Sequence, residues 1–205
     1  SVPQLMHCKY GANPHIPEFG PYDWDFIRRW IAPHVNSMVA TGGAEQVDEA
    51  REWKLGGGRW IVERGMPAPR DVEADPEVVA QALVANLVDE PTEPDGVLID
   101  EFFSGNFPSF PGFTEAFKRL AGDERIRGLA LYPYVGRHYP LTDDWNEGDP
   151  EAPDNSGPFY RATFDAALPD GEPGSANWWV SWERYLPEFR YAEDADSFMH
   201  ERLLA

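Results

Sequence analysis

Hydrophobic residues fall in short runs along this chain, and segments with helical periodicity lie between the runs. A short apolar run bounded by glycine, proline or asparagine is typical of a buried strand. On this basis we predict strands at Gln4–Lys9, Ser37–Thr41, Trp60–Glu63, Gly96–Phe102, Gly128–Tyr132 and Asn177–Glu183. The periodic segments predict helices at Tyr22–Ala32, Ala44–Leu55, 75–89, Thr114–Leu120, Pro158–Leu168 and Ala192–Leu204.

Two of these helices have clear boundary signals. Asp75 precedes Pro76 and Glu77, so an N-cap residue is followed by proline at the first helical position. The segment Ala44–Leu55 runs into three consecutive glycines, which end helices readily because glycine adopts the left-handed backbone conformation without strain. Both segments are therefore predicted as helices with defined ends.

The alternation of strands and helices predicts parallel βαβ units with right-handed crossovers. The loop that follows the first strand, 10–14, matches neither the dinucleotide-binding fingerprint nor a phosphate-binding P-loop. Polar side chains follow several strand ends instead, as in a (β/α) barrel of the TIM type. We therefore expect an α/β barrel of this type, folded as a single domain over residues 1–205.

Six βα units are fewer than the eight of a complete barrel, which takes about 250 residues. Three explanations stay open: the barrel is incomplete, its last strands lie outside this chain, or an atypical strand lies within 133–176. Phe159–Phe164 is the best position for such a strand. A long acidic loop is expected at about 133–157, where it can lie over the mouth of the barrel.

Charge and cysteine content narrow the classes of partner. The chain has 17 basic and 36 acidic residues, a net charge of −19, which argues against nucleic acids and anionic membranes as partners. No apolar run approaches the roughly 20 residues of a membrane span. Cys8 is the single cysteine, so an internal disulfide is impossible. We expect a soluble protein, and secreted, periplasmic and cytoplasmic locations are all compatible with the sequence.

The strand Gly96–Phe102 ends in the acidic pair Asp100-Glu101, which is the sharpest chemical feature of the chain. Side chains alternate along a strand, so one acid should face the inside of the barrel and the other the helices. Burying a carboxylate among apolar residues requires a specific environment. The alternative interpretation is a helix cap or an ion pair with an arginine. We expect catalysis at Asp100 or Glu101, with Glu183 at the end of the last strand as the partner acid.

Aromatic and polar residues near the strand ends are the candidates for substrate binding. Sugar rings stack on aromatic planes, and their hydroxyls exchange hydrogen bonds with polar side chains; the alternative is that these residues only pack. The candidates are His7, Tyr10, Asn13, Glu63, Tyr132, Tyr134, Trp178, Trp182 and Tyr185.

The segment Asp95–Phe102 resembles the fourth-strand region of glycoside-hydrolase-type (β/α)₈ barrels, where an Asp-Gly pair, an aliphatic run and a terminal acid recur. In such families the fourth-strand acid is commonly the proton donor and a later strand supplies its partner. The resemblance implies Glu101 or Asp100 as donor and Glu183 as partner. It covers about ten residues and identifies no single family, because the acids are adjacent rather than spaced by one, and Asp100 stands where other families have asparagine.

These observations favour a carbohydrate-active hydrolase that cleaves a glycosidic bond with two carboxylates and needs no cofactor. Its partner would be an oligo- or polysaccharide. One alternative is a metal-dependent barrel isomerase or hydrolase that uses His7, Glu63 and Asp100, although these residues lack the fixed spacing of a metal motif. The other alternative is a non-catalytic sugar-binding barrel.

Overall fold

A computed structural model describes residues 8–10, 23–103, 107–136 and 181–183. The strand predicted at Gln4–Lys9 is described only from Cys8 onward. The predicted helices Pro158–Leu168 and Ala192–Leu204, the possible strand Phe159–Phe164 and residues 137–157 of the predicted acidic loop lie outside the described residues.

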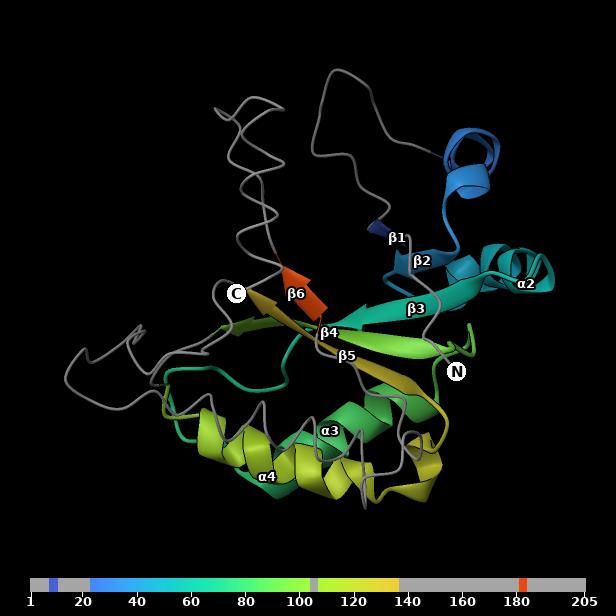
Figure 1. The fold of residues 1–205 in the computed structure, drawn as a ribbon. Helices are drawn as coiled ribbons and strands as arrows, with labels where there is room; N and C mark the ends of the chain where they lie inside the picture. The colour runs from blue at the N-terminus through green and yellow to red at the C-terminus, as the bar shows by residue number, and fades with distance from the viewer. Residues whose placement is uncertain (1–7, 11–22, 104–106, 137–180, 184–205) are drawn as a thin grey trace, which may run out of the picture.

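The described strands form one parallel sheet, with each strand beside its neighbour in sequence (Figure 1). In chain order the strands are β1 (Cys8–Tyr10), β2 (Ser37–Ala40), β3 (Arg59–Arg64), β4 (Gly96–Phe103), β5 (Ala130–Gly136) and β6 (Ser181–Glu183). Every pair of neighbours is parallel. The α/β class with a parallel sheet is therefore confirmed, and each predicted strand has a counterpart in the sheet.

Helices connect the strands in the described part of the chain. They are α1 (Trp24–Phe26), which continues as a π-helix at Ile27–Ile31, α2 (Val47–Leu55), α3 (Pro76–Val88) and α4 (Phe110–Ala121), with short 3₁₀ turns at Ala32–His34, Ala44–Gln46 and Glu124–Ile126. The predicted start of α3 is confirmed, since the Asp75 carboxylate accepts hydrogen bonds from the amides of Glu77 and Val78. The predicted end of α2 is also confirmed, because Gly56 forms its C-cap.

Two predicted boundaries were wrong. Helix α4 begins at Phe110 rather than Thr114, because buried Phe110 and Phe113 extend its apolar face toward the start of the helix. Strand β5 continues to Gly136, so residues 133–136 belong to the sheet and not to a loop. Pro133 lacks an amide hydrogen, and it lies in β5 next to a register irregularity of β4, where proline is tolerated in a sheet.

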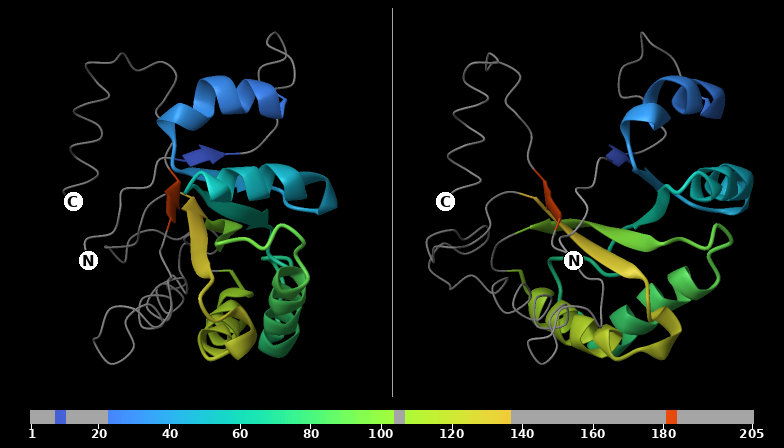
Figure 2. Two further views of the ribbon diagram at one scale, coloured as in Figure 1. Left: turned by 90° about the vertical axis from the view of Figure 1, so that its right-hand side faces the viewer. Right: turned by 45° about the vertical axis from the view of Figure 1, so that its right-hand side comes forward.

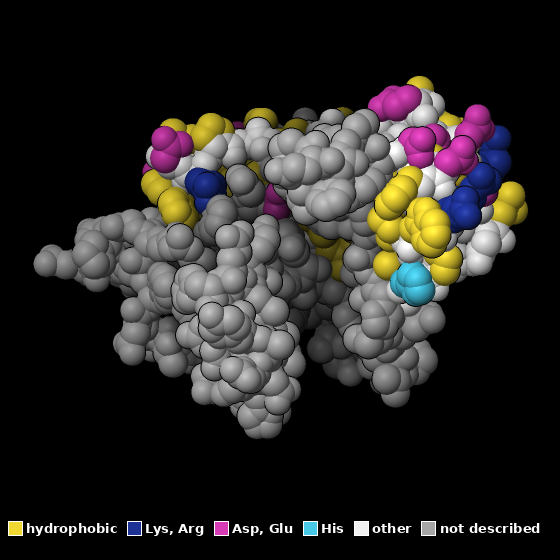
Figure 3. All heavy atoms as spheres, turned by 90° about the horizontal axis from the view of Figure 1, so that it is seen from above, with side chains coloured by type: hydrophobic (Ala, Val, Ile, Leu, Met, Phe, Trp, Pro, Cys, Tyr) yellow, Lys and Arg dark blue, Asp and Glu magenta, His cyan; other side chains and the backbone are white. Residues whose placement is uncertain are grey.

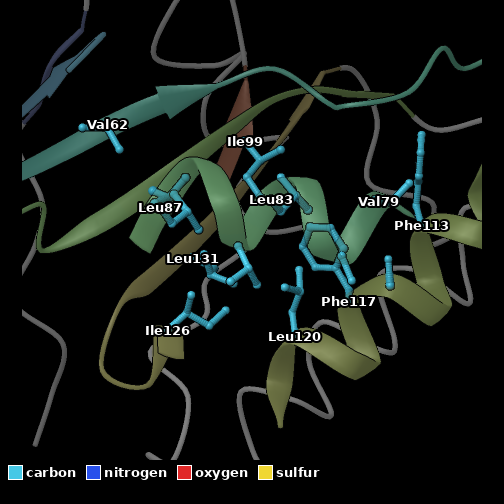
Figure 4. Packing of buried hydrophobic residues seen from close by; sticks show 14 of the residues in the cluster. Val62, Val79, Leu83, Leu87, Ile99, Phe113, Phe117, Leu120, Ile126 and Leu131 are labelled. Carbon is cyan, nitrogen blue, oxygen red and sulfur yellow. The ribbon is translucent and has the colours of Figure 1, made fainter. Parts of the chain in front are cut away.

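The helices pack on one face of the sheet (Figure 2). One continuous core joins alternate residues of the strands, such as Val62, Ile99 and Leu131, to the buried faces of α3 and α4 (Figure 4). Phe113, Phe117 and Leu83 are among its largest fully buried side chains. Ala50 of α2 and Ile27 belong to the same core. We call the face of the sheet that contacts this core the helix face.

The opposite face of the sheet carries a separate apolar cluster made of Val39, Ile61, Leu98, Ala130 and Tyr132. Each of these residues is the sequence neighbour of a helix-face residue, as expected from alternation along a strand. We call this second surface the inner face. The side chains of the inner face at the carboxyl ends of the strands are the candidates for a functional site.

Candidate active site at the carboxyl ends of the strands

The inner face changes from apolar to polar at the same step on successive strands. Two residues after Val39, Ile61 and Leu98, the alternate positions are Thr41, which lies just beyond the end of β2, Glu63 and Asp100. We call these three residues the polar tier. The apolar cluster forms a floor, and the polar tier lies beyond it toward the carboxyl ends, where parallel α/β proteins build their sites.

Glu63 and Asp100 lie close together in this tier. Glu63 is in register with Leu98, and Asp100 is the next residue of β4 on the same face. One strand spacing of about 4.8 Å and two residues of about 3.3 Å separate their backbone positions by roughly 8 Å, within reach of long side chains. Both residues are half-buried, and neither is without an interaction partner. The structure thus brings two of the predicted site residues together.

A β-bulge lies at the predicted catalytic pair. Ile99 is in register with Pro133, and Phe102 is in register with Val135, so both Asp100 and Glu101 stand against Tyr134 alone. The bulge interrupts the regular alternation of side chains between the two faces of the sheet. Alternation therefore no longer predicts that Asp100 and Glu101 face opposite sides. Bulges are common beside active sites because they redirect side chains.

Glu183 is the last described residue of β6, which pairs with β5. Ser181 is in register with Tyr134, and Glu183, two residues later, is in register with Gly136. The positions of Glu101 and Glu183 are separated by two strand spacings of about 4.8 Å and two residues of about 3.3 Å, which gives a backbone distance of roughly 12 Å. Trp182 is in register with Val135.

The remaining predicted binding residues divide into two groups. Tyr10 is in register with Val39. His7, Asn13, Trp178 and Tyr185 lie outside the described residues.

Tyr132 belongs to the floor and not to the open part of the tier. Its side chain is 4% exposed. Its ring atom Cε2 lies 2.9 Å from the position that a Cβ of Gly96 would take, and the carbonyl oxygen of Ala130 lies 2.8 Å from that position. The ring therefore covers Gly96, and only glycine fits beneath it. Packing thus explains both the glycine of the Asp-Gly pair and the burial of Tyr132.

Asp95 has a structural explanation as well. Its carboxylate accepts a hydrogen bond from the amide of Trp60 at 2.8 Å, and its own amide donates to the carbonyl of Trp60 at 2.8 Å. These bonds join the segment before β4 to β3. The acid of the Asp-Gly pair therefore aligns two strands.

A buried ion pair behind the tier was not predicted from the sequence. Arg64, the last residue of β3, pairs with Glu90, and their side chains are 19% and 4% exposed. The Glu90 carboxylate also accepts hydrogen bonds from the Gly43 amide at 2.9 Å, from the Thr92 amide at 3.2 Å and from the Thr92 hydroxyl at 2.8 Å. The glycine pair Gly42-Gly43 after a strand is the one sequence signal that points to this turn.

The environment of Glu90 favours its charged form. Burial by itself would raise the pKa of this carboxyl group, but the hydrogen bonds from Gly43 and Thr92 and the charge of Arg64 outweigh burial and lower the pKa below its ordinary value. Glu90 is therefore a charged structural residue at neutral pH. A proton donor would need the opposite shift.

The surface over α1 and α2 carries both acidic and basic side chains (Figure 3). Arg28 pairs with Asp25 and Glu52, and the Arg29 guanidinium lies 4.9 Å from the ring centre of Trp30, which is 58% exposed. Within residues 23–100 and 107–133, whose side chains are described, no group of three or more His, Cys, Asp or Glu residues is arranged to hold a metal ion. No helix described here is both long and apolar enough to cross a lipid bilayer.

Comparisons with protein-family models, with curated proteins and with solved structures found no match to this chain.

Proposed function

We propose that this protein is a glycoside hydrolase that uses acids at the carboxyl ends of its strands. The observation that carries the proposal is the polar tier above an apolar floor on the inner face, with acids at two neighbouring strand ends. In the register of β6, Glu183 is level with Gly136, at the carboxyl end of β5. Carboxylates that converge on one site are the groups that glycosidic bond cleavage requires.

We further propose that the sheet is part of a (β/α) barrel. The strand order β1 to β6 never reverses, whereas a doubly wound sheet reverses its order at a switch point. The described helices contribute to one core on one face of the sheet. The strands are also staggered, since Tyr10 at the end of β1 is level with Gly96 at the start of β4 through Val39 and Ile61. Barrel closure requires such a stagger.

In this proposal Glu101 or Asp100 donates the proton to the leaving oxygen, and Glu183 acts as nucleophile or base. Two glutamate side chains directed at one point can reduce a backbone distance of roughly 12 Å to the separations that glycosidases use, about 5 Å for retention or roughly 6.5–9.5 Å for inversion. Glu63 would bind a sugar hydroxyl beside the donor. No metal or cofactor takes part in this scheme.

The test is hydrolysis of a panel of neutral, amino and acidic glycans by the purified protein. Glu101→Gln, Asp100→Asn and Glu183→Gln are compared with Glu115→Gln, which changes an exposed acid on α4. We expect Glu183→Gln and one of the two β4 variants to lose about 10²–10⁴ in kcat, because general acid–base groups contribute that much. Glu115→Gln should keep its activity.

Two results would overturn the proposal. Glycan binding without turnover by the wild-type protein would favour the non-catalytic sugar-binding barrel. A stoichiometric divalent ion in the purified protein, with activity lost on chelation, would favour the metal-dependent enzyme. Full activity of Glu183→Gln would remove Glu183 from the mechanism and leave the partner acid to be found elsewhere.

A further inference from the structure

The ion pair of Arg64 and Glu90 joins three segments that are distant in sequence. We use the name clasp for Arg64 and Glu90 together with the donors Gly43 and Thr92. Glu90 follows α3, Gly43 lies in the turn after β2, and Arg64 ends β3. The stagger of the strands explains how they meet, because β4 begins at the level of Ile61, close to the carboxyl ends of β2 and β3. The segment between α3 and β4, which contains Glu90, therefore lies near the carboxyl ends of β2 and β3.

The arginine of the clasp also binds the backbone of the polar tier. Arg64 Nη1 donates a hydrogen bond to the carbonyl oxygen of Glu63 at 2.7 Å and another to the carbonyl oxygen of Thr41 at 2.7 Å. Arg64 Nη2 pairs with Glu90. A single planar guanidinium thus fixes two tier residues through their backbone, and the buried carboxylate of Glu90 fixes the guanidinium.

The surroundings leave Glu90 little freedom to move. Gly42 has a φ of +76°, and a Cβ on this residue would lie 2.7 Å from Glu90 Oε2. The backbone of the turn therefore packs directly on the carboxylate. A buried ion pair contributes little net stability, because removing two charges from water offsets most of their attraction. We therefore interpret this ion pair as a contact that holds Arg64 and Glu90 in a fixed geometry.

We propose that Arg64 and Glu90 are positioning residues that hold Glu63 at its place in the polar tier without touching the substrate. This inference rests on the proposed function for its catalytic meaning. Arg64 directly follows Glu63 in the sequence. Its guanidinium donates hydrogen bonds to the backbone carbonyl oxygens of Glu63 and Thr41. Loosening the clasp would shift a binding carboxylate by a fraction of an ångström. Shifts of this size reduce rates strongly, since a displacement of about 1 Å can lower a rate by 10²-fold.

The test compares Glu90→Gln and Arg64→Lys with two controls. Lysine cannot bind Thr41, Glu63 and Glu90 together in the planar geometry of arginine. Glu77→Gln removes the partner of Arg119 in an exposed ion pair between α3 and α4. Ile126→Val weakens the helix-face core by one methyl group, away from the tier. We expect both clasp variants to lose about 10- to 100-fold in kcat, with the controls unchanged.

A rescue experiment separates positioning from general stability. Glu90→Ala leaves the donors Gly43, Thr92 and Arg64 around a vacated carboxylate position, where formate can bind. We expect Glu90→Ala to recover kcat with added formate in a saturable manner, while Glu77→Ala shows no such response. Loss of kcat in Ile126→Val to the same extent as in Glu90→Gln would overturn the inference, because instability alone would then explain the loss.

Amide hydrogen exchange tests the clasp even if no glycan is hydrolysed. We expect the amides of Glu63 and Arg64 to exchange faster in Glu90→Ala than in the wild-type protein, and to be unchanged in Glu77→Ala. An inactive wild-type protein with this exchange pattern would contradict the proposed function and support the positioning of Glu63. Unchanged exchange at Glu63 and Arg64 would overturn the positioning role, whatever the activity.

Discussion

Gly42 lies in the left-handed backbone region and directly against the carboxylate of Glu90. Replacing it with alanine adds backbone strain and a Cβ 2.7 Å from Glu90 Oε2, so the buried ion pair has to move. We expect Gly42→Ala to lower the free energy of unfolding by about 2–4 kcal/mol, because the collision adds an overpacking cost to the backbone strain. Urea denaturation at neutral pH measures this loss.

Gly57 provides the matched control for this substitution. It has a φ of +86°, and a Cβ there would meet nothing within 4 Å. Gly57→Ala therefore carries the strain without the collision, and its expected effect is about 1 kcal/mol. Equal losses in the two variants would mean that backbone strain alone makes glycine necessary at Gly42.

Glu90 should make stability depend on pH in the acidic range. Its folded pKa lies below the ordinary value of 4.5, so its contribution to stability is present above the unfolded pKa and is lost as the pH falls through the folded pKa. Glutamine resembles protonated glutamate. We therefore expect the difference in free energy of unfolding between the wild-type protein and Glu90→Gln to be largest near pH 7 and to shrink steadily below pH 4.5. A difference independent of pH, measured by urea denaturation at several pH values, would contradict this.

Helix α3 carries an acid at each end, with opposite expected effects. Asp75 caps the amino end with its carboxylate, whereas Asp89 places an acid at the carboxyl end, where the helix dipole disfavours negative charge. We expect Asp75→Ala to lower the free energy of unfolding by about 1 kcal/mol. Asp89→Asn should leave it unchanged or raise it by a few tenths of a kcal/mol. Chemical denaturation of both variants measures the contrast, and a loss in Asp89→Asn equal to that in Asp75→Ala would exclude this account of the helix ends.

The net charge of −19 acts on the molecule as a whole. Excess like charge destabilises a compact state through self-repulsion, and salt screens exposed charges beyond about 10 Å at 0.1 M. We expect the midpoint of urea denaturation to rise between about 10 mM and 500 mM NaCl at pH 7. A falling midpoint would show instead that surface ion pairs such as Arg28–Glu52 outweigh the repulsion.

At the scale of the whole molecule, periodicity and boundary residues predicted the order of elements well. The start of α3 follows from Asp75 and Pro76, and β4 follows from its uninterrupted apolar run, because both signals are local. The ends of β5 and α4 were not predictable in this way. The sequence around Pro133 suggests a strand end until the register irregularity beside it is known. Phe110 resembles a loop residue until its burial in the helix-face core is known.

The candidate site was likewise predictable from the sequence only in part. The sequence by itself determined which strands end in acids, since Glu63, Asp100, Glu101 and Glu183 each close an apolar run. Only the tertiary structure decided that Glu63 and Asp100 share a face, that Asp100 and Glu101 stand together against Tyr134, and that Glu90 anchors Arg64. The physical reason is that local patterns specify elements within a few residues, whereas register, bulges and buried ion pairs arise from contacts between strands and loops far apart in the chain.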